Sequence, residues 1–298
     1  MGFKTQDGFQ FTGSGDGLKY VSGKRISFYL SEQGDPGSGD AGDTGGGGGG
    51  GGTYNGTSGI VTTNIVLDLN AGISNSYSGS GTAWNDISGN GNNFTLTNGP
   101  TYTSSDGGAI VFDGTNDYAV SPSGVSFLKF GTDDYSYGVW AQFDSFAQNA
   151  ATLSTKQDNN LGSANTTWQL DFDGTGGKFR HVFRYGSSGQ NILHTDSSLT
   201  SSYASTGTWY YIFIVNDRSE DEMKLYVNGS LIHTHQDVRY GTQTDVGNFD
   251  GFWHIGANRG LTTFTDGKIA QVHVYKGKAL TASEVLQNYN ATKSTYGY

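Results

Sequence analysis

The side chains best suited to chemistry in this sequence are aromatic rings, amides and carboxylates on predicted loops. A sugar is held by an aromatic ring against its apolar face and by amides and carboxylates that exchange hydrogen bonds with its hydroxyls. For any single tryptophan, burial in a core is the competing interpretation, because large aromatic side chains are highly buried on average. The candidate sugar-binding residues are Trp84, Asp86 and Asn90 on one loop and Trp253, Asn258 and Arg259 around another.

Other reactive arrangements are weak or missing. The chain has no cysteine, which removes disulfides, thiolate metal sites and cysteine nucleophiles. His233 and His235 point to the same face of one predicted strand, but no third metal ligand is apparent and an exposed strand face explains them. No Gly-x-Ser-x-Gly elbow occurs, and the glycines from Gly45 to Gly52 lack the lysine and the helix that phosphate binding requires. The sequence therefore predicts no nucleophile with a base.

Charge and hydropathy limit the partners. The 298 residues include 17 Lys and Arg against 27 Asp and Glu, a formal net charge of -10, without a dense basic tract. Nucleic acids and anionic membranes both require clustered basic residues, so neither is an expected partner. No apolar run reaches the roughly 18 to 20 residues of a membrane span, and the first ten residues lack the apolar core of a secretory signal. Synthesis in a bacterial cytoplasm is therefore expected.

Composition divides the chain into three regions. Residues 1–33 hold two short apolar bursts and are expected to form a small N-terminal β anchor, which has too few strands to bury a core without a partner. Residues 34–59 are expected to be a Gly-rich linker, with an ordered polyglycine at a symmetry axis as the alternative. Residues 60–298 alternate apolar and polar positions between frequent turn signals, which predicts an all-β, antiparallel two-sheet β-sandwich.

Several elements of the sandwich can be placed by residue. Asn228-Gly229 between two alternating segments predicts a hairpin with a type I′ turn. Thr281 and Glu284 have the spacing of a capping box and predict a short C-terminal helix through about Asn290. Residues 167–172 and 178–185 are expected to form another hairpin. Further strands are expected at 65–67, 109–112, 135–143, 209–215 and 269–275.

Five segments, in this order and spacing, resemble the laminin-G-like branch of the concanavalin A-like lectin and glucanase superfamily. The resemblance implies an antiparallel jelly roll with a ligand-facing rim or concave sheet. The closing ALTASEVLQNYNATK resembles variants carried by structural proteins of tailed bacteriophages, especially phages of cyanobacteria. The five segments are DISGNGNNFTL (86–96), IVFDGTNDYAV (110–120), KLYVNG (224–229), HIGA (254–257) and GKIAQVHVYKGKALTASEV (267–285).

The resemblance also bears on metal binding and catalysis. Relatives often read Ile-Asp-Glu where this chain has Ile269-Ala270-Gln271, so two acidic side chains are missing from a rim that commonly holds calcium. Asp68 and Asp86, with carbonyls of the loop at 88–93, remain as candidate calcium ligands. Glucanase relatives use Glu-x-Asp-x-x-Glu as acid and nucleophile, and this pattern is absent. The acidic residues 220–222 fall in a polar turn, so we expect no enzymatic activity.

The resemblance implies a phage virion structural protein that displays a lectin-like domain and binds host-surface carbohydrate. Residues 1–33 are expected to contact other virion proteins and to associate as a homotrimer. Two alternatives remain open. One is a decoration or cement protein of capsid, neck or tail with protein contacts only, and the other is a polysaccharide depolymerase.

Overall fold

The computed structural model describes residues 54–124, 126–146, 151–157, 166–173, 178–185, 189–194, 204–236, 251–258 and 260–298. The chain divides into two units, Met1–Gly47 and Gly48–Tyr298, and the described residues all belong to the second. The expected N-terminal β anchor and most of the expected linker therefore lie outside the described residues.

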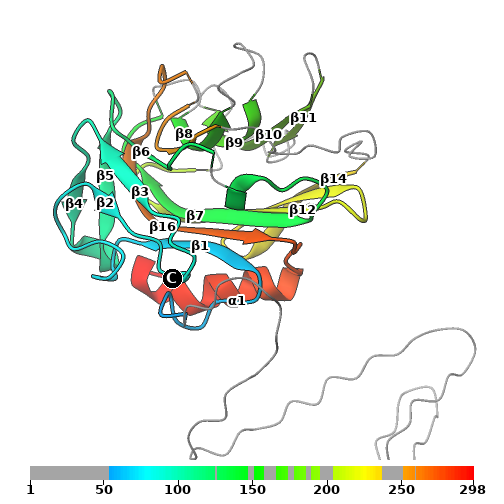
Figure 1. Ribbon diagram of the computed structural model, residues 1–298, viewed down its shortest axis with the longest axis horizontal. Coiled ribbons are helices and arrows are strands. Elements are labelled where there is room, and N and C mark those ends of the chain that lie inside the picture. The colour runs from blue at the N-terminus through cyan, green and yellow to red at the C-terminus, as the bar shows by residue number, and fades with distance from the viewer. Residues whose placement is uncertain are drawn as a thin grey trace, which may run out of the picture. The chain divides into compact units, whose positions relative to one another are not determined.

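Two antiparallel sheets stack face to face, which confirms the expected two-sheet sandwich (Figure 1). Sheet I has the order β14-β13-β12-β7-β16-β5-β4, and β1 also pairs with β16. Sheet II has the order β11-β10-β9-β8-β15-β6-β3-β2. The strands of sheet I are β14 (Ser230–Gln236), β13 (Glu222–Val227), β12 (Trp209–Asp217), β7 (Tyr135–Phe143), β16 (Asp266–Lys276), β5 (Ala109–Asp113), β4 (Thr101–Thr103) and β1 (Ile65–Asn70). Those of sheet II are β11 (Gly189–His194), β10 (Lys178–Tyr185), β9 (Thr166–Asp173), β8 (Ala151–Gln157), β15 (Trp253–Ile255), β6 (Tyr118–Val120), β3 (Phe94–Thr97) and β2 (Ala83–Trp84).

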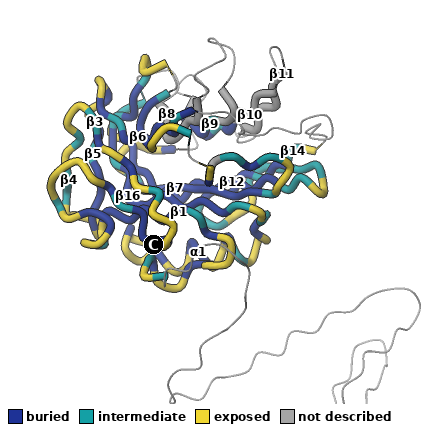
Figure 2. Tube along the Cα trace, viewed as in Figure 1, coloured by how far each residue is buried: buried dark blue, intermediate teal, exposed yellow. Residues whose placement is uncertain are grey.

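The main core lies between the two sheets. Alternate residues of β7, including Tyr137, Val139 and Phe143, point into it, as the period of two predicts. All nine residues of β7 are buried, because the opposite face of sheet I is covered as well. Figure 2 shows this double burial as a continuous dark blue path through β7 and its neighbours. The expected interior position of residues 209–215 is confirmed too, since β12 lies between β13 and β7.

The second core lies between sheet I and the helix α1 (Ala282–Thr292), which runs along the outer face of that sheet (Figure 1). Thr281 and Glu284 form both hydrogen bonds of the predicted capping box. Trp140 stacks on Tyr296 with ring centroids 4.2 Å apart, and its Nε1 donates to Thr292 Oγ1 at 2.8 Å. The helix is thus part of the fold. Among the described residues, no helix combines the length and the apolar character needed to cross a membrane.

Both predicted hairpins are present. Asn228 and Gly229 have φ angles of 51° and 76°, as a type I′ turn requires, and join β13 to β14. β9 pairs with β10 in antiparallel register, with Phe172 opposite Phe179. Turn chemistry and alternation therefore predicted these strand pairs correctly.

The chain enters the sandwich on the side of α1. Ile60 and Val61 pack into the second core. Val61 N donates to Asn288 Oδ1 at 2.8 Å, and Tyr275 Oη donates to Val61 O at 2.9 Å. The outer face of sheet II consequently lies on the opposite side of the sandwich from the point where the chain arrives.

Candidate functional site

The two candidate sugar-binding tryptophans are core residues. Trp84 and Trp253 have 0% of their surface exposed. Trp253 makes an edge-to-face contact with Phe94, with ring centroids 5.5 Å apart. An indole without exposed surface cannot stack on a pyranose ring, so the prediction that these tryptophans bind sugar is wrong. The competing interpretation, burial in the core, is confirmed for both.

The loop after β15 uses its amide to stabilise itself. Asn258 Oδ1 accepts from Thr262 N at 2.9 Å, and Asn258 Nδ2 donates to Thr262 Oγ1 at the same distance. Arg259, the third candidate at this rim, lies outside the described residues. The described part of this rim therefore shows an internally bonded turn rather than a set of free sugar ligands.

The loop of Asp86 and Asn90 seals the free edge of β1. Ile87 N donates to Asp68 O at 2.9 Å, as a neighbouring strand would. The side chains of Asn90 and Asn92 donate to the carbonyls of Ile65 and Val66 at 3.2 and 2.7 Å. An unpaired strand edge exposes backbone groups that attract other chains, so this loop has a structural role.

The carboxylate of Asp86 is fully engaged in the same loop. Its Oδ1 accepts from Asp68 N and Ser88 N, each at 2.9 Å. Its Oδ2 accepts from Ser88 Oγ at 2.8 Å and from Asn92 N at 2.9 Å. Four donors surround the group, and a calcium ion needs the same oxygen lone pairs. Asp86 does not fit the predicted role of calcium ligand.

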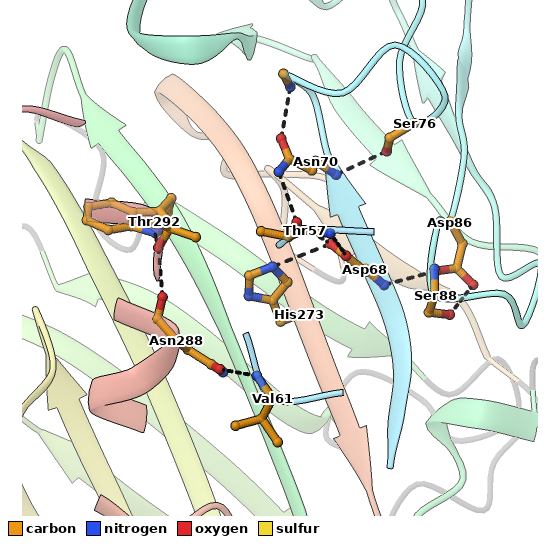
Figure 3. Close-up of polar contacts among 12 residues, drawn as sticks. Thr57, Val61, Asp68, Asn70, Ser76, Asp86, Ser88, His273, Asn288 and Thr292 are labelled. Atoms are coloured by element: carbon orange, nitrogen blue, oxygen red, sulfur yellow. Dashed lines mark hydrogen bonds and ion pairs between the residues drawn. The ribbon is translucent and has the colours of Figure 1, made fainter. Parts of the chain in front are cut away.

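Asp68 is also surrounded by polar groups, and Figure 3 shows Thr57 and His273 beside its carboxylate. Its Oδ2 accepts from Tyr54 Oη and Thr57 N, each at 2.8 Å, and its Oδ1 accepts from Thr57 Oγ1 at 3.1 Å. His273, its partner on β16, places Nε2 3.4 Å from Oδ1. A Cβ on Gly56 would lie 2.2 Å from Oδ2, so only glycine permits this approach.

The pKa shift of Asp68 is the one expected for an ionised carboxylate that accepts several hydrogen bonds. Burial by itself raises the pKa of Asp68, but the facing imidazole of His273 and the hydrogen bonds from Thr57 and Tyr54 outweigh it and hold the pKa below its ordinary value. The prediction of Asp68 as a calcium ligand is therefore wrong for the same reason as for Asp86. Among the described ranges, no group of three or more His, Cys, Asp or Glu side chains can hold a metal ion.

The substitution Asp86→Ala tests whether Asp86 stabilises its loop or binds calcium. Asp86→Ala leaves the amides of Asp68, Ser88 and Asn92 without an acceptor, which we expect to lower the free energy of unfolding by about 2 kcal/mol. The loss should be the same in excess calcium and in excess EGTA, measured by urea unfolding. A loss that appears only with calcium would assign the metal to this loop.

The outer face of sheet II carries a different group of functional side chains. On β9, Leu170 and Phe172 point into the core, so Gln169 and Asp171 point outward. On β15, the flanking residues Trp253 and Ile255 are core residues, so His254 points outward. The register aligns Gln169 with Thr155, Thr155 with His254, and His254 with Val120 in one row across the sheet.

One half of this face is polar. Arg180 on β10 donates to both oxygens of Asp171, from Nε at 2.8 Å and from Nη2 at 2.6 Å. The amide of Gln169 donates to the same carboxylate. The Asp171 side chain is completely buried, whereas that of Arg180 keeps 23% of its surface exposed. A bidentate pair of this kind fixes the plane of the guanidinium group.

The other half is aromatic. Tyr118 on β6 meets the ring of His254 edge-to-face at 5.4 Å, and Phe252 lies parallel to that ring at 6.3 Å. Burial lowers the pKa of His254 to about 4, so the imidazole is neutral near pH 7. His254 Nδ1 is buried and has no hydrogen-bond partner among the described residues. Half-exposed rings thus lie beside polar groups, the combination that suits a sugar.

The sugar-binding residues predicted from the sequence are placed on predicted loops, so none of these face residues is among them. The signal was present in the alternation of residues 168–172, which places Gln169 and Asp171 opposite to core positions. It was present in the triplet 253–255 as well, where His254 separates two apolar residues. The order of the strands in sheet II, which brings the two segments together, is not visible in local periodicity.

Two stacked antiparallel sheets, with a helix packed on the outer face of one of them, form a β-sandwich of the lectin-like class. Residues 113–286 match the family described as concanavalin A-like lectin/glucanases superfamily, and the chain belongs to this family. The expected superfamily is therefore confirmed. No curated protein matches the chain.

Solved structures share this fold at low sequence identity. The binding domain of Paraclostridial Mosquitocidal Protein 1 is 19% identical, with a TM-score of 0.57 over 77% of this chain and 52% of that one. The botulinum neurotoxin serotype G binding domain is 18% identical, with a TM-score of 0.58 over 78% and 52%. This chain therefore matches only about half the length of either toxin structure. Domain 4 of AbnA, a GH43 extracellular arabinanase from Geobacillus stearothermophilus solved with arabinotriose, is 16% identical, with a TM-score of 0.54 over 76% and 98%.

Proposed function

We propose that the chain is a carbohydrate-binding protein and that the outer face of sheet II is its binding surface. The observation that carries this proposal is the pairing of the Asp171 and Arg180 platform with the rings of Tyr118 and Phe252 around His254. The guanidinium of Arg180, which keeps 23% of its side-chain surface exposed and is oriented by Asp171, would supply directed hydrogen bonds, and the rings would supply apolar area for a sugar ring.

The charges on this face favour neutral sugars. Arg180 is paired with Asp171, so its charge is compensated on this face. His254 stays neutral because burial lowers its pKa to about 4. The whole chain carries a formal net charge of -10, which repels polyanions. Shallow contacts to uncharged sugars are weak one by one, so several copies acting together would provide avidity.

Three similar structures support the proposal. Domain 4 of AbnA was solved in complex with arabinotriose, and this chain matches 98% of its length. The two toxin structures are binding domains by description. Their low identity makes them evidence for the fold, and the carbohydrate role of this chain rests on its own side chains.

The wider role that we propose is display on a phage particle. The closing segment resembles tailed-phage structural proteins, and residues 1–33 would attach to other virion proteins. Tyr54 and Val61 pack on the α1 side of the sandwich, opposite the proposed binding face. A domain attached from that side would direct sheet II toward a host surface. In the alternative role as decoration or cement, another virion protein would cover sheet II.

Tyr118→Ala tests the binding face. Removing this ring deletes half of the aromatic wall, and we expect affinity for host-surface polysaccharide to fall about tenfold or more. The measurement is titration calorimetry or a glycan array with the full-length chain. Tyr102→Ala is the matched control, because Tyr102 lies on β4 of the other sheet.

Equal binding by the two variants would place the ligand elsewhere. If the wild-type chain binds neither extracted polysaccharide nor whole cells, the adhesive function is wrong, and the cement role is favoured. Release of new reducing sugar ends from the polysaccharide would instead support a depolymerase.

A further inference from the structure

The sequence contains four Asn-Gly pairs, and all of them lie within the described ranges. In such a pair the backbone nitrogen of the glycine can attack the side-chain amide of the asparagine, because glycine has no Cβ and reaches dihedral angles closed to other residues. The bond between that nitrogen and Cγ forms, the Cγ–Nδ2 bond breaks, and ammonia leaves. Water then opens the cyclic imide to give aspartate or isoaspartate. The pairs are Asn55-Gly56, Asn90-Gly91, Asn98-Gly99 and Asn228-Gly229.

Three of the four asparagines are held by hydrogen bonds of their own side chains. Asn90 Nδ2 donates to a serine hydroxyl at 2.9 Å and to a carbonyl of β1 at 3.2 Å. Asn98 Nδ2 donates to a backbone carbonyl at 2.8 Å. Asn228 Oδ1 accepts from a backbone amide at 2.9 Å, and its Nδ2 donates to a tyrosine hydroxyl at 3.2 Å. These bonds have to break before the amide can turn toward the following glycine.

Asn55 differs from these three because nothing holds its side chain. It is exposed, and neither Asn55 nor Gly56 forms a hydrogen bond with another described residue. Their neighbours are held instead, Tyr54 through its hydroxyl and Thr57 through its amide and its hydroxyl. The side-chain amide of Asn55 can therefore turn toward Gly56 N without first breaking a hydrogen bond.

We propose that Asn55 is a site of spontaneous deamidation, and that isoaspartate formed there releases the start of the sandwich from Asp68. Water is the only co-reactant and ammonia is the leaving group, so the reaction needs no enzyme. The segment concerned is residues 54–57, which we call the strap. Three hydrogen bonds hold the strap on Asp68, one from Tyr54 and two from Thr57. Asn55 and Gly56 lie between these two anchoring residues, so a change in the backbone there acts on all three bonds.

The strap has no room for a longer backbone. A Cβ on Gly56 would lie 2.2 Å from Asp68 Oδ2 and 2.7 Å from ring atoms of Tyr54. In isoaspartate the main chain runs through the former side chain, which adds one carbon atom between residue 55 and Gly56. Gly56 and Thr57 then cannot both keep their positions while Tyr54 stays on Asp68. Aspartate, the other product, adds a negative charge but leaves the length of the backbone unchanged.

Ageing of the full-length chain tests the site, and the other three Asn-Gly pairs are internal controls. The protein is kept at mildly alkaline pH, and the converted fraction at each pair is followed by mass spectrometry of its peptides. Because the hydrogen bonds of the other pairs must break first, we expect Asn55 to convert about fivefold faster or more. The rate should rise with pH, because the attacking nitrogen must lose its proton. Conversion at Asn55 no faster than at the other three pairs would overturn the proposal.

Hydrogen exchange of the Thr57 amide tests the release of the strap. This amide donates to Asp68 Oδ2 at 2.8 Å and Thr57 is buried, so the amide should be protected in fresh protein. We expect its protection to fall about tenfold or more in the isoaspartate fraction, because local opening then no longer requires the rest of the sandwich to unfold.

Two variants separate the added carbon atom from the added charge. Asn55→Gln would have to close a larger ring, so it should not convert and should keep the protection of Thr57 through the same ageing. Freshly purified Asn55→Asp should keep this protection as well, because it adds only a charge. Unchanged protection in the isoaspartate fraction would overturn the release of the strap. None of these outcomes depends on a sugar, so a failure here is distinct from a failure of carbohydrate binding.

Discussion

Asp68→Ala should destabilise the sandwich by about 3 to 5 kcal/mol, the usual cost of removing one partner from a buried charged network. The substitution leaves Thr57 N and Thr57 Oγ1 without their acceptor and removes one of the two acceptors of Tyr54 Oη. It also leaves the buried His273 without the carboxylate that it faces. Urea unfolding of the full-length chain, followed by tryptophan fluorescence, measures the loss. All five tryptophans lie beyond residue 47, so the signal reports the sandwich unit alone.

Asp133→Ala is the matched control, because Asp133 is exposed and an exposed substitution is expected to change stability by no more than about 0.5 kcal/mol. A similar effect of both variants would mean that the hydrogen bonds around Asp68 contribute little. That result would also reopen the question of whether Asp68 serves another ligand.

The pH dependence of a second variant, Asp68→Asn, has a defined sign. The pKa of Asp68 lies below its ordinary value because His273 and the donors of Thr57 and Tyr54 outweigh the effect of burial. A carboxylate with a depressed folded pKa stabilises the protein fully above its unfolded pKa of about 3.9, and this stabilisation is lost as the pH falls through the folded value. The difference between wild type and Asp68→Asn should therefore be constant from neutral pH down to about pH 5 and shrink in stronger acid. A difference that grows on acidification would contradict the assignment.

The strands could be predicted because their signals are local. A period of two places Tyr137, Val139 and Phe143 on one face without any knowledge of the partner strand. Asn228-Gly229 specifies its own turn, and Thr281 with Glu284 specifies a helix start from four consecutive residues. Each of these elements is determined by contacts or dihedral angles within a short stretch of chain.

The site could not be predicted in the same way. Trp84 and Asp86 are two residues apart, yet Trp84 fills the core while Asp86 holds a loop onto β1. Which role a polar or aromatic residue takes depends on the neighbouring strand, and β1 is distant from this loop in sequence. The row that aligns Gln169 with His254 through Thr155 likewise depends on the strand order of sheet II. Local periodicity predicts which residues share a face and not which strands are neighbours.

Trp140→Ala should cost about 3 to 5 kcal/mol, the range for truncating a fully buried tryptophan. Trp140 joins sheet I to the C-terminal segment, because it stacks on Tyr296 at 4.2 Å and donates to Thr292 Oγ1 at 2.8 Å. Trp140→Phe keeps an aromatic ring but loses that hydrogen bond, so its cost should be clearly smaller. The measurement is urea unfolding followed by circular dichroism, which does not depend on the tryptophan that is removed.

A double-mutant cycle then shows whether the C-terminal segment is bound through this ring. Tyr296→Ala removes the stacked partner, and the coupling free energy between the two substitutions should be about 1 kcal/mol, as for other aromatic pairs. Strict additivity would mean that Trp140 stabilises sheet I without holding the C-terminal segment. In that case α1 would be anchored instead by Asn288, whose amide bonds both Val61 and Tyr275 and so ties the start of the sandwich to its last helix.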